Sequence, residues 1–152
     1  MTGTSAKQKI IARLLAVCQP MIALYGLRKA ERRHTLWLLE PVKPALHLIV
    51  GDEVVQGEDT RGYTLQFPVM FKLILTGQND LDEQTDKMSA YLQETIEADL
   101  ELCPTDGTGL CSALKYDGEL PFTEELMKPD GGTVLMYLVQ YRRERGNPGT
   151  KY

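Results

Sequence analysis

The sequence of 152 residues has few of the residue types on which most enzyme active sites depend. It contains only two histidines, His34 and His47, and neither has a Ser, Cys or carboxylate beside it at the spacing of a known catalytic motif. The GxSxG, HExxH, GxxxxGK and GxGxxG patterns are also missing. These absences favour a protein that is not an enzyme, and we expect no cofactor and no bound metal.

Cysteine is scarce as well, with only Cys18, Cys103 and Cys111 in the chain. An odd number of cysteines, without CxxC or zinc-ligand spacing, argues against a disulfide framework and a structural zinc site. No apolar run has the length of a membrane span, and Lys9 and Arg13 interrupt the apolar residues near the N-terminus. We therefore expect a soluble protein that is made, in reduced form, in the cytoplasm.

Cations are outnumbered, since the formal net charge is −4, and this opposes general nucleic-acid binding. One acidic stretch, "DLDEQTDKMSAY", begins like a calcium-binding loop because Asp80, Asp82 and Gln84 occupy alternate positions. However, Thr85 stands where such a loop requires glycine, and Tyr91 stands where it requires glutamate. The sequence therefore predicts no calcium site.

What the chain does have is an unusually long alternating segment, "GYTLQFPVMFKLILTG", from Gly62 to Gly77. Every second residue from Tyr63 to Leu75 is apolar, which is typical of a strand of about 13 residues with one buried face. The segment "PALHLIV" before it predicts a second strand, joined to it by the acidic connector "GDEVVQGEDTRG". Together they predict a long antiparallel hairpin, with four acids at its tip: Asp52, Glu53, Glu58 and Asp59.

The length of this hairpin is its notable property. A strand of that length spans roughly 43 Å at about 3.3 Å per residue, whereas a domain of this size has a radius of gyration near ~15 Å. We therefore expect one end of the hairpin to project beyond the core. The alternative is a strand that bends strongly and breaks at Pro68, which indicates an edge strand or a bulge because proline cannot donate to a ladder.

The remaining elements complete a small α+β domain. A capping box of Ser5 and Gln8 predicts a helix from about Ala6 to Cys18 that Pro20 ends. We expect a loop or short helix and then a strand in "TLWLL", an acidic helix from Asn79 or Asp80 to about Glu101, a short strand with an Asp-Gly turn in "LCSALKYDGEL", and a central last strand in "TVLMYLVQYRR".

This order predicts one domain over residues 1–152, with a flexible C-terminal tail from about residue 144. The fold class is α+β, with a mostly antiparallel or mixed sheet, a long β-hairpin and two helices packed on one face. The tail "GNPGTKY" either docks on a neighbouring subunit or is disordered.

Charge is separated along the chain. The segment from Asp80 to Glu101 carries eight acids against Lys87 alone, whereas "RKAERR" and "RRER" are basic. Such opposite surfaces suit head-to-tail contacts that close subunits into a ring, although charged runs also serve solubility alone. The candidate subunit or partner interface consists of Arg28, Lys29, Arg32, Arg33, Arg142, Arg143 and Arg145.

In its order of elements the chain resembles bacteriophage tail terminator proteins, which cap the tail tube of long-tailed phages. The resemblance is carried by "KQKIIARLLAVCQP", by the long hairpin, by "DKMSAYLQETIEADL" and by "TVLMYLVQYRRERGNP". It covers nearly the whole chain as a pattern, without a diagnostic motif, so it assigns no role to any single residue. The segment from Met21 to Leu39, with its "RKAERRH", is longer and more basic than the resemblance implies.

The resemblance implies a mixed sheet flanked by helices and assembly into a hexameric ring. Such a ring ends tube polymerisation and presents a docking surface for the head connector, at the head-proximal end of the virion tail. The implied partners are further copies of the chain, the tail tube protein, the head-tail connector and DNA that passes through the lumen without specific binding; no membrane is implied. The acids of the hairpin tip would then repel DNA from the channel wall.

Three other functions stay open at this point. One is a different neck or head-tail joining protein of a phage. The second is a nucleic-acid-binding module that uses "RKAERR" and "RRER", although the acidic helix opposes it and aromatic pairs for base stacking are missing. The third is a small-ligand or hydrolytic enzyme, for which the sequence offers no constellation of residues.

Overall fold

The computed structural model describes residues 5–33, 44–75, 81–99, 102, 109–124 and 130–149. The predicted α+β class is confirmed, with two long helices and a six-stranded mixed, mostly antiparallel sheet. The helices are α1 (Ala6–Cys18), the short α2 (Pro20–Tyr25) and α3 (Leu81–Glu97). The strands are β1 (Lys29–Arg33), β2 (Ala45–Val50), β3 (Val54–Glu58), β4 (Gly62–Leu75), β5 (Ala113–Glu124) and β6 (Asp130–Glu144).

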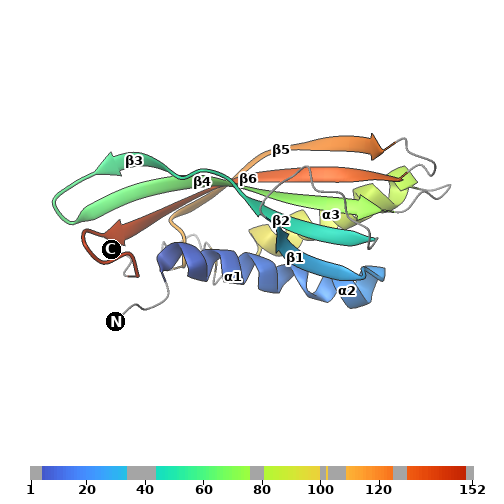
Figure 1. Ribbon diagram of the computed structural model, residues 1–152, viewed down its shortest axis with the longest axis horizontal. Helices are drawn as coiled ribbons and strands as arrows, with labels where there is room; N and C mark the ends of the chain where they lie inside the picture. Colours follow the sequence, from blue (N-terminus) through green and yellow to red (C-terminus); the bar gives the residue numbers. More distant parts are fainter. Residues whose placement is uncertain are drawn as a thin grey trace.

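The sheet is organised around its two longest neighbouring strands, β4 and β6 (Figure 1). The strand order is β1-β2-β4-β6-β5, and β3 pairs with β4 in addition. Only the β1–β2 pair is parallel. The β4–β6 ladder runs without a register shift from Gly62 opposite Glu144 to Leu75 opposite Gly131. Because Pro68 lies opposite Leu138 inside this ladder, β4 is not broken at the proline.

On its other side, β4 pairs first with β3 and then with β2, and Pro68 lies opposite the interruption between these two strands. Strand β2 ends at Val50, opposite Val69, and β3 begins at Val54, opposite Gln66. The Gly51 N–H donates to the Pro68 carbonyl at 2.8 Å, so the proline's missing N–H faces residues 51–53, where the ladder is interrupted. A Cβ atom on Gly51 would clash with the proline ring. The edge strand or bulge expected at Pro68 is therefore replaced by an interruption between β2 and β3, in the segment opposite the proline.

Two local predictions need correction. The connector between β2 and β4 contains a strand of its own, β3. The expected Asp-Gly turn is wrong, because β5 is a single strand of 12 residues with a bulge between Tyr116 and Gly118. Gly118 adopts a φ of 112°, which only glycine adopts readily, and this lets the strand continue past the bulge.

The N-terminal prediction is confirmed in detail, since the side chains and backbones of Ser5 and Gln8 form the capping box of α1. Pro20 follows the end of α1 and is the first residue of α2, which ends at Gly26 with a left-handed φ of 67°. The basic segment Lys29–Arg33 is a strand, which the sequence did not indicate. The strand expected in "TLWLL", and with it His34, lies outside the described residues.

The core explains why the two long helices share one face of the sheet. Alternate residues of β4 and β6, among them Phe71 and Tyr137, lie in one buried cluster with Leu14 of α1 and Leu92 of α3. Each large side chain that is fully buried in this way stabilises the fold by about 1.5–3 kcal/mol. Strand β6 lies between β4 and β5, which confirms the central position predicted for it.

Gly132 gives a test of the β4–β6 ladder. A Cβ atom on Gly132 would meet the Leu73 carbonyl oxygen and carbon, which are backbone atoms and cannot move aside. We expect Gly132→Ala to lower the free energy of unfolding by about 1–3 kcal/mol or more, measured by urea denaturation. Gly57→Ala is the matched control, because its Cβ would only touch Thr64 at 3.8 Å. Equal stabilities of the two variants would contradict the close β4–β6 approach.

Candidate interaction surfaces

The most distinctive surface is a three-stranded extension, here called the arm, which consists of β3, the first part of β4 up to Gln66 and the end of β6 from Val139. Figure 1 shows its tip extending beyond the N-terminal end of α1. The tip is a turn held by Asp59, whose Oδ1 accepts from the N–H groups of Arg61 at 2.8 Å and Gly62 at 3.0 Å. Aspartate is favoured in such turns because its carboxylate replaces a backbone acceptor.

At this tip the structure joins residues that the sequence had assigned to separate surfaces. The Arg145 guanidinium contacts Glu58 at 2.5 Å, the Asp59 carbonyl at 3.0 Å and the Tyr63 hydroxyl at 3.0 Å. Arg143 and Arg145 also lie against the Tyr63 ring, 4.7 and 4.9 Å from its centre. The hydrogen bond with Glu58 raises the pKa of the Arg145 guanidinium.

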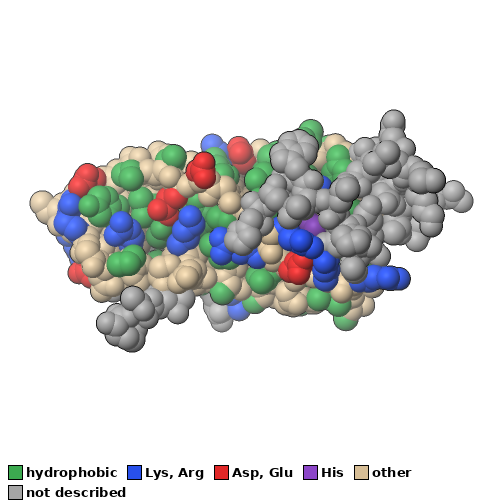
Figure 2. All heavy atoms as spheres, in the orientation of Figure 1, with side chains coloured by type: hydrophobic (Ala, Val, Ile, Leu, Met, Phe, Trp, Pro, Cys, Tyr) green, Lys and Arg blue, Asp and Glu red, His purple; other side chains and the backbone are tan. Residues whose placement is uncertain are grey.

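The tip is consequently neither purely acidic nor purely basic. On the face shown in Figure 2, the end of the molecule that carries the arm mixes basic, acidic and hydrophobic side chains. Arg142 is exposed on β6, opposite Thr64. Basic residues of the candidate interface thus fall into two groups, with Arg142, Arg143 and Arg145 at the arm and the other four on or beside β1.

Asp52 and Glu53 lie away from the terminal turn, at the break between β2 and β3. The Tyr141 hydroxyl donates to Glu53 and thereby connects the start of β3 to β6 across β4. Burial, followed by this hydrogen bond, raises the pKa of the Tyr141 hydroxyl. Asp52 is exposed.

The second surface is the edge of the sheet at β1. Glu31 lies between two cations, 3.3 Å from the Lys29 Nζ and 2.7 Å from the Arg33 Nε. These three residues share one face because they alternate with Ala30, which packs against the core. Arg28 and Arg32 are exposed. The segment from Arg28 to Arg33 therefore remains basic despite its internal acid.

The outer strand of the arm is exposed over nearly its whole length. Val54 and Val55 retain 49% and 62% of their accessible surface. They lie opposite Gln66 and Leu65 respectively, so they point to opposite faces of the sheet. Apolar side chains exposed on both faces of an edge strand are unusual in an isolated protein, since such edges invite pairing with another chain.

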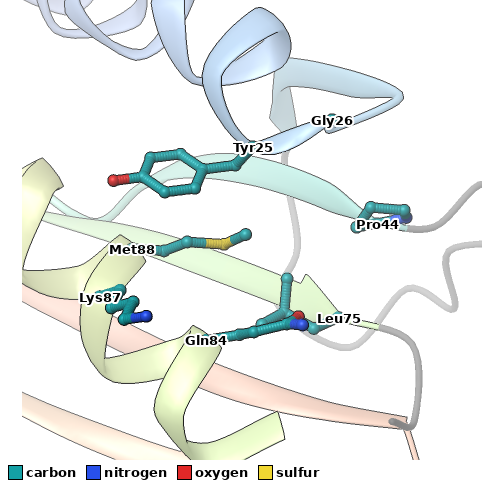
Figure 3. A pocket seen from close by; sticks show the side chains of 7 residues that line it. All are labelled: Tyr25, Gly26, Pro44, Leu75, Gln84, Lys87 and Met88. Atoms are coloured by element: carbon teal, nitrogen blue, oxygen red, sulfur yellow. The ribbon is translucent and has the colours of Figure 1, made fainter. Parts of the chain in front are cut away.

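Two cavities lie at the other end of the sheet. The larger, about 440 Å³, is lined by Tyr25, Gly26, Pro44, Leu75, Gln84, Lys87 and Met88. Figure 3 shows Tyr25 of α2 and Met88 of α3 lying across it from one another, with Gln84 and Lys87 beside them. Lys87 pairs with Glu83 at 3.2 Å. This lining offers apolar surface, one amide and one cation, which suits binding and supplies no nucleophile with an adjacent base.

The second cavity, about 330 Å³, is lined by Asp82, Thr85, Asp86, Glu119, Pro121, Phe122 and Gly132. Its acids do not converge: among the described residues no group of three or more His, Cys, Asp or Glu could hold a metal ion.

Within the same residues, no helix combines the length and apolar character needed to cross a membrane. His47 is 2% exposed on β2, where it lies opposite Lys72.

One ion pair just after the end of α3 was missed by sequence reasoning. Asp99 was counted among the solvated acids, yet its side chain is 4% exposed and accepts two hydrogen bonds from Arg13, at 2.7 and 3.2 Å. This pair holds the end of α3 against α1. The helical spacing of Asp99 from Leu92 and Ile96, which are buried, was the signal that could have revealed it.

The thiols of Cys18 and Cys111 are both buried. Their sulfur atoms lie 3.2 Å from the carbonyls of Leu14 and Leu102 respectively. Burial raises the pKa of the Cys18 thiol to about 12, so it carries almost no thiolate at neutral pH. Cys103 lies outside the described residues.

The chain as a whole is thus an α+β protein with a projecting β arm, a basic sheet edge and exposed apolar strand residues. No protein-family model matches this sequence, and no curated protein matches it either.

The described tail residues pack on their own chain, since the Ala6 N–H donates to the Pro148 carbonyl at 2.8 Å and the Lys9 Nζ to the Gly149 carbonyl at 3.4 Å.

Removal of the buried carboxylate should be far more harmful than removal of an exposed one. We expect Asp99→Ala to lower the free energy of unfolding by about 1.5–3 kcal/mol, because it deletes two hydrogen bonds to a charged group. Glu83→Ala removes an exposed pair with Lys87 and should change stability by about 0.5 kcal/mol or less. Thermal unfolding monitored by circular dichroism measures both. A small effect of Asp99→Ala would show that the α1–α3 contact does not depend on this pair.

The Cys18 thiol should be inert while the protein is folded. Its pKa is raised to about 12, so the nucleophilic thiolate stays rare as pH rises from 7 to 9, whereas an unfolded thiol ionises near its ordinary value of about 8.5. We expect iodoacetamide at pH 8 to modify Cys18 only after denaturation, as measured by peptide mass spectrometry. Rapid labelling of the folded protein would contradict the described burial.

Proposed function

We propose that this chain is a structural subunit of a long-tailed phage virion that assembles into a homo-oligomeric ring, expected to be a hexamer. The ring caps the head-proximal end of the tail tube, ends its polymerisation and forms the docking surface for the head connector. The protein acts through its surfaces and catalyses no reaction. In this role it is made in the host cytoplasm and functions in the virion tail.

The observation that carries this proposal is the arm. It combines a β4–β6 ladder that continues to residues 62 and 144 with an outer strand, β3, on which Val54 and Val55 are both largely exposed. Exposed valines on an open strand edge are an aggregation hazard for a monomer, and burial between subunits removes that hazard. A capping protein needs an element that reaches beyond its own core to neighbouring subunits or to the tube, and the arm has this shape (Figure 1).

The arm tip supports an acidic channel lining less strongly than the sequence does. Glu58 contacts Arg145, Glu53 accepts from Tyr141, and Asp59 accepts from two backbone N–H groups of its own turn, so three of the four acids are engaged within the chain. Repulsion of DNA requires a wall with an excess of negative charge. We therefore assign the arm to protein contacts first, and we propose passage of DNA through the ring only as a consequence of ring assembly.

The alternative within the same class is another neck or head-tail joining protein, which would use the same ring-forming surfaces. The nucleic-acid-binding alternative loses support from two contacts. Lys29 and Arg33 share Glu31, and Arg145 contacts Glu58, so several of the cations it would need face carboxylates already. Phosphate binding depends on cations that can replace the counterions of DNA.

Deletion of the gene from its phage or prophage tests the proposal. We expect defective particles whose tails exceed the normal length and carry no heads, because tube growth is no longer stopped. Negative-stain electron microscopy of induced lysates measures tail length, and expression of the chain in trans should restore it. Tails of normal length that merely lack heads would identify a neck protein instead. Normal particles, or a gene outside any phage or prophage, would refute the proposal.

A further inference from the structure

The described sheet has three open margins: the outer edges of β1, β3 and β5, since each of these strands pairs with one neighbour within the described part of the chain. The β5 edge is poorly suited to pairing. A bulge interrupts it between Tyr116 and Gly118, and Pro121 lies in its second half. Bulges and prolines are the features by which natural sheets protect an edge. The β1 and β3 edges are each five residues long and contain no proline. The β1 ladder is regular, and β3 has one register shift, between Val55 and Gly57.

The β3 edge has acids at both ends. Asp52 and Glu53 precede the strand, while Glu58 and Asp59 end it, and no cation lies between them, so the segment 52–59 carries a charge of −4. Its centre carries the exposed Val54 and Val55. This edge is therefore apolar in the middle and acidic at each end, with Arg145 partly neutralising the end at Glu58.

The β1 edge has the opposite pattern. Arg28 and Lys29 lie at its start, Arg32 and Arg33 at its end, and Glu31 lies between them, so the segment 28–33 carries a charge of +3. The Arg28 N–H donates to the Pro44 carbonyl at 2.8 Å, toward β2. Because backbone groups alternate in direction along a strand, those of Lys29, Glu31 and Arg33 point to the outer edge.

We propose that the β3 edge of one copy of this chain docks along the β1 edge of the next copy. The charges match in either strand direction, because each end of β3 carries two acids and each end of β1 carries two bases. Pairing of β3 with β3, or of β1 with β1, would bring like charges together at the ends, and like charges across an interface disfavour association. The pattern therefore selects contact between unlike edges.

A contact between two different surfaces of the same chain is heterologous, and it repeats from copy to copy until the rotation closes a ring. In Figure 1, β3 lies at the upper margin of the arm, whereas β1 lies below β2 and next to α1 and α2, so the two edges do not face each other within one chain. The inference rests on the self-association that the proposed function requires and adds to it the surfaces that meet.

The charged groups of both edges reach solvent. Arg28 and Arg32 of the β1 edge are exposed, and the Arg145–Glu58 pair at the β3 edge is about half exposed on both sides. Exposed pairs of this kind contribute little stability. A carboxylate accepts several hydrogen bonds, so Glu58 can contact a cation of a neighbouring copy without losing Arg145.

Two charge-reversed variants test the proposal. Arg28→Glu with Arg32→Glu turns the β1 edge from +3 to −1, and Asp52→Lys with Gln56→Lys and Glu58→Lys turns the β3 edge from −4 to +1. We expect each variant alone to dissociate about tenfold or more easily than the wild type, measured by sedimentation velocity and native mass spectrometry over a concentration series. An equimolar mixture of the two, or one chain with all five substitutions, should associate again.

Lys115→Glu on the β5 edge is the matched control, and it should associate as the wild type does. The wild-type assembly should also weaken as salt rises, because the contact is between charges. Restored association identifies the β1–β3 contact even if single variants are less stable, because misfolding is not repaired by a second reversal.

The proposal is overturned if the mixture and the five-substitution chain stay dissociated, if Lys115→Glu disrupts assembly to the same degree, or if the wild type stays monomeric at every concentration. None of these outcomes affects the tail-length phenotype of the gene deletion. A normal tail length in that deletion, together with rescue by the paired reversals, would instead refute the tail-capping function and leave the edge contact in place.

Discussion

The pairing of β4 with β6 is the interaction on which the rest of the molecule depends. It joins residue 62 to residue 144 and residue 75 to residue 131 without a register shift. One half of this ladder carries the helices and the buried cluster, and the other half carries the arm. Because the same two strands run through both halves, the arm is an extension of the core sheet.

The break beside Pro68 makes this division possible. Strand β4 has two successive partners on one side, β2 along its second half and β3 along its first half. The proline removes the N–H that would otherwise lack a partner at the change, and Gly51 lets the chain pass close to the proline ring. The outer strand of the arm can therefore take a charge and burial pattern different from that of β2, which is buried at every position except Val50.

These features explain how one small fold can present two unlike edges. Strand β1 pairs with β2, whereas β3 pairs directly with β4. The basic edge is therefore one strand further from β4 than the acidic edge is. Both cavities lie where residues of α3 meet the sheet, and the larger one is also lined by residues of α2.

Much of the architecture could be predicted from periodicity, which is a local property of the sequence. The alternation from Tyr63 to Leu75 indicated a long strand, the Ser5–Gln8 capping box indicated the start of α1, and the apolar run from Val134 to Val139 indicated a central strand. Each of these patterns reports which residues avoid water within a single element, and that requires no knowledge of the partner.

The candidate surfaces were predictable only in part, because they depend on which elements become neighbours. The sequence by itself determined the types of the long helices and strands, the charges of each segment and the shortage of catalytic residues. Tertiary structure decided that "KAERR" is an edge strand, that β3 forms within the connector, that Arg145 reaches Glu58 and that Asp99 binds Arg13. The last two contacts join residues more than 80 positions apart. Their geometry follows from the pairing of distant strands and the packing of helices on them, which local periodicity does not encode.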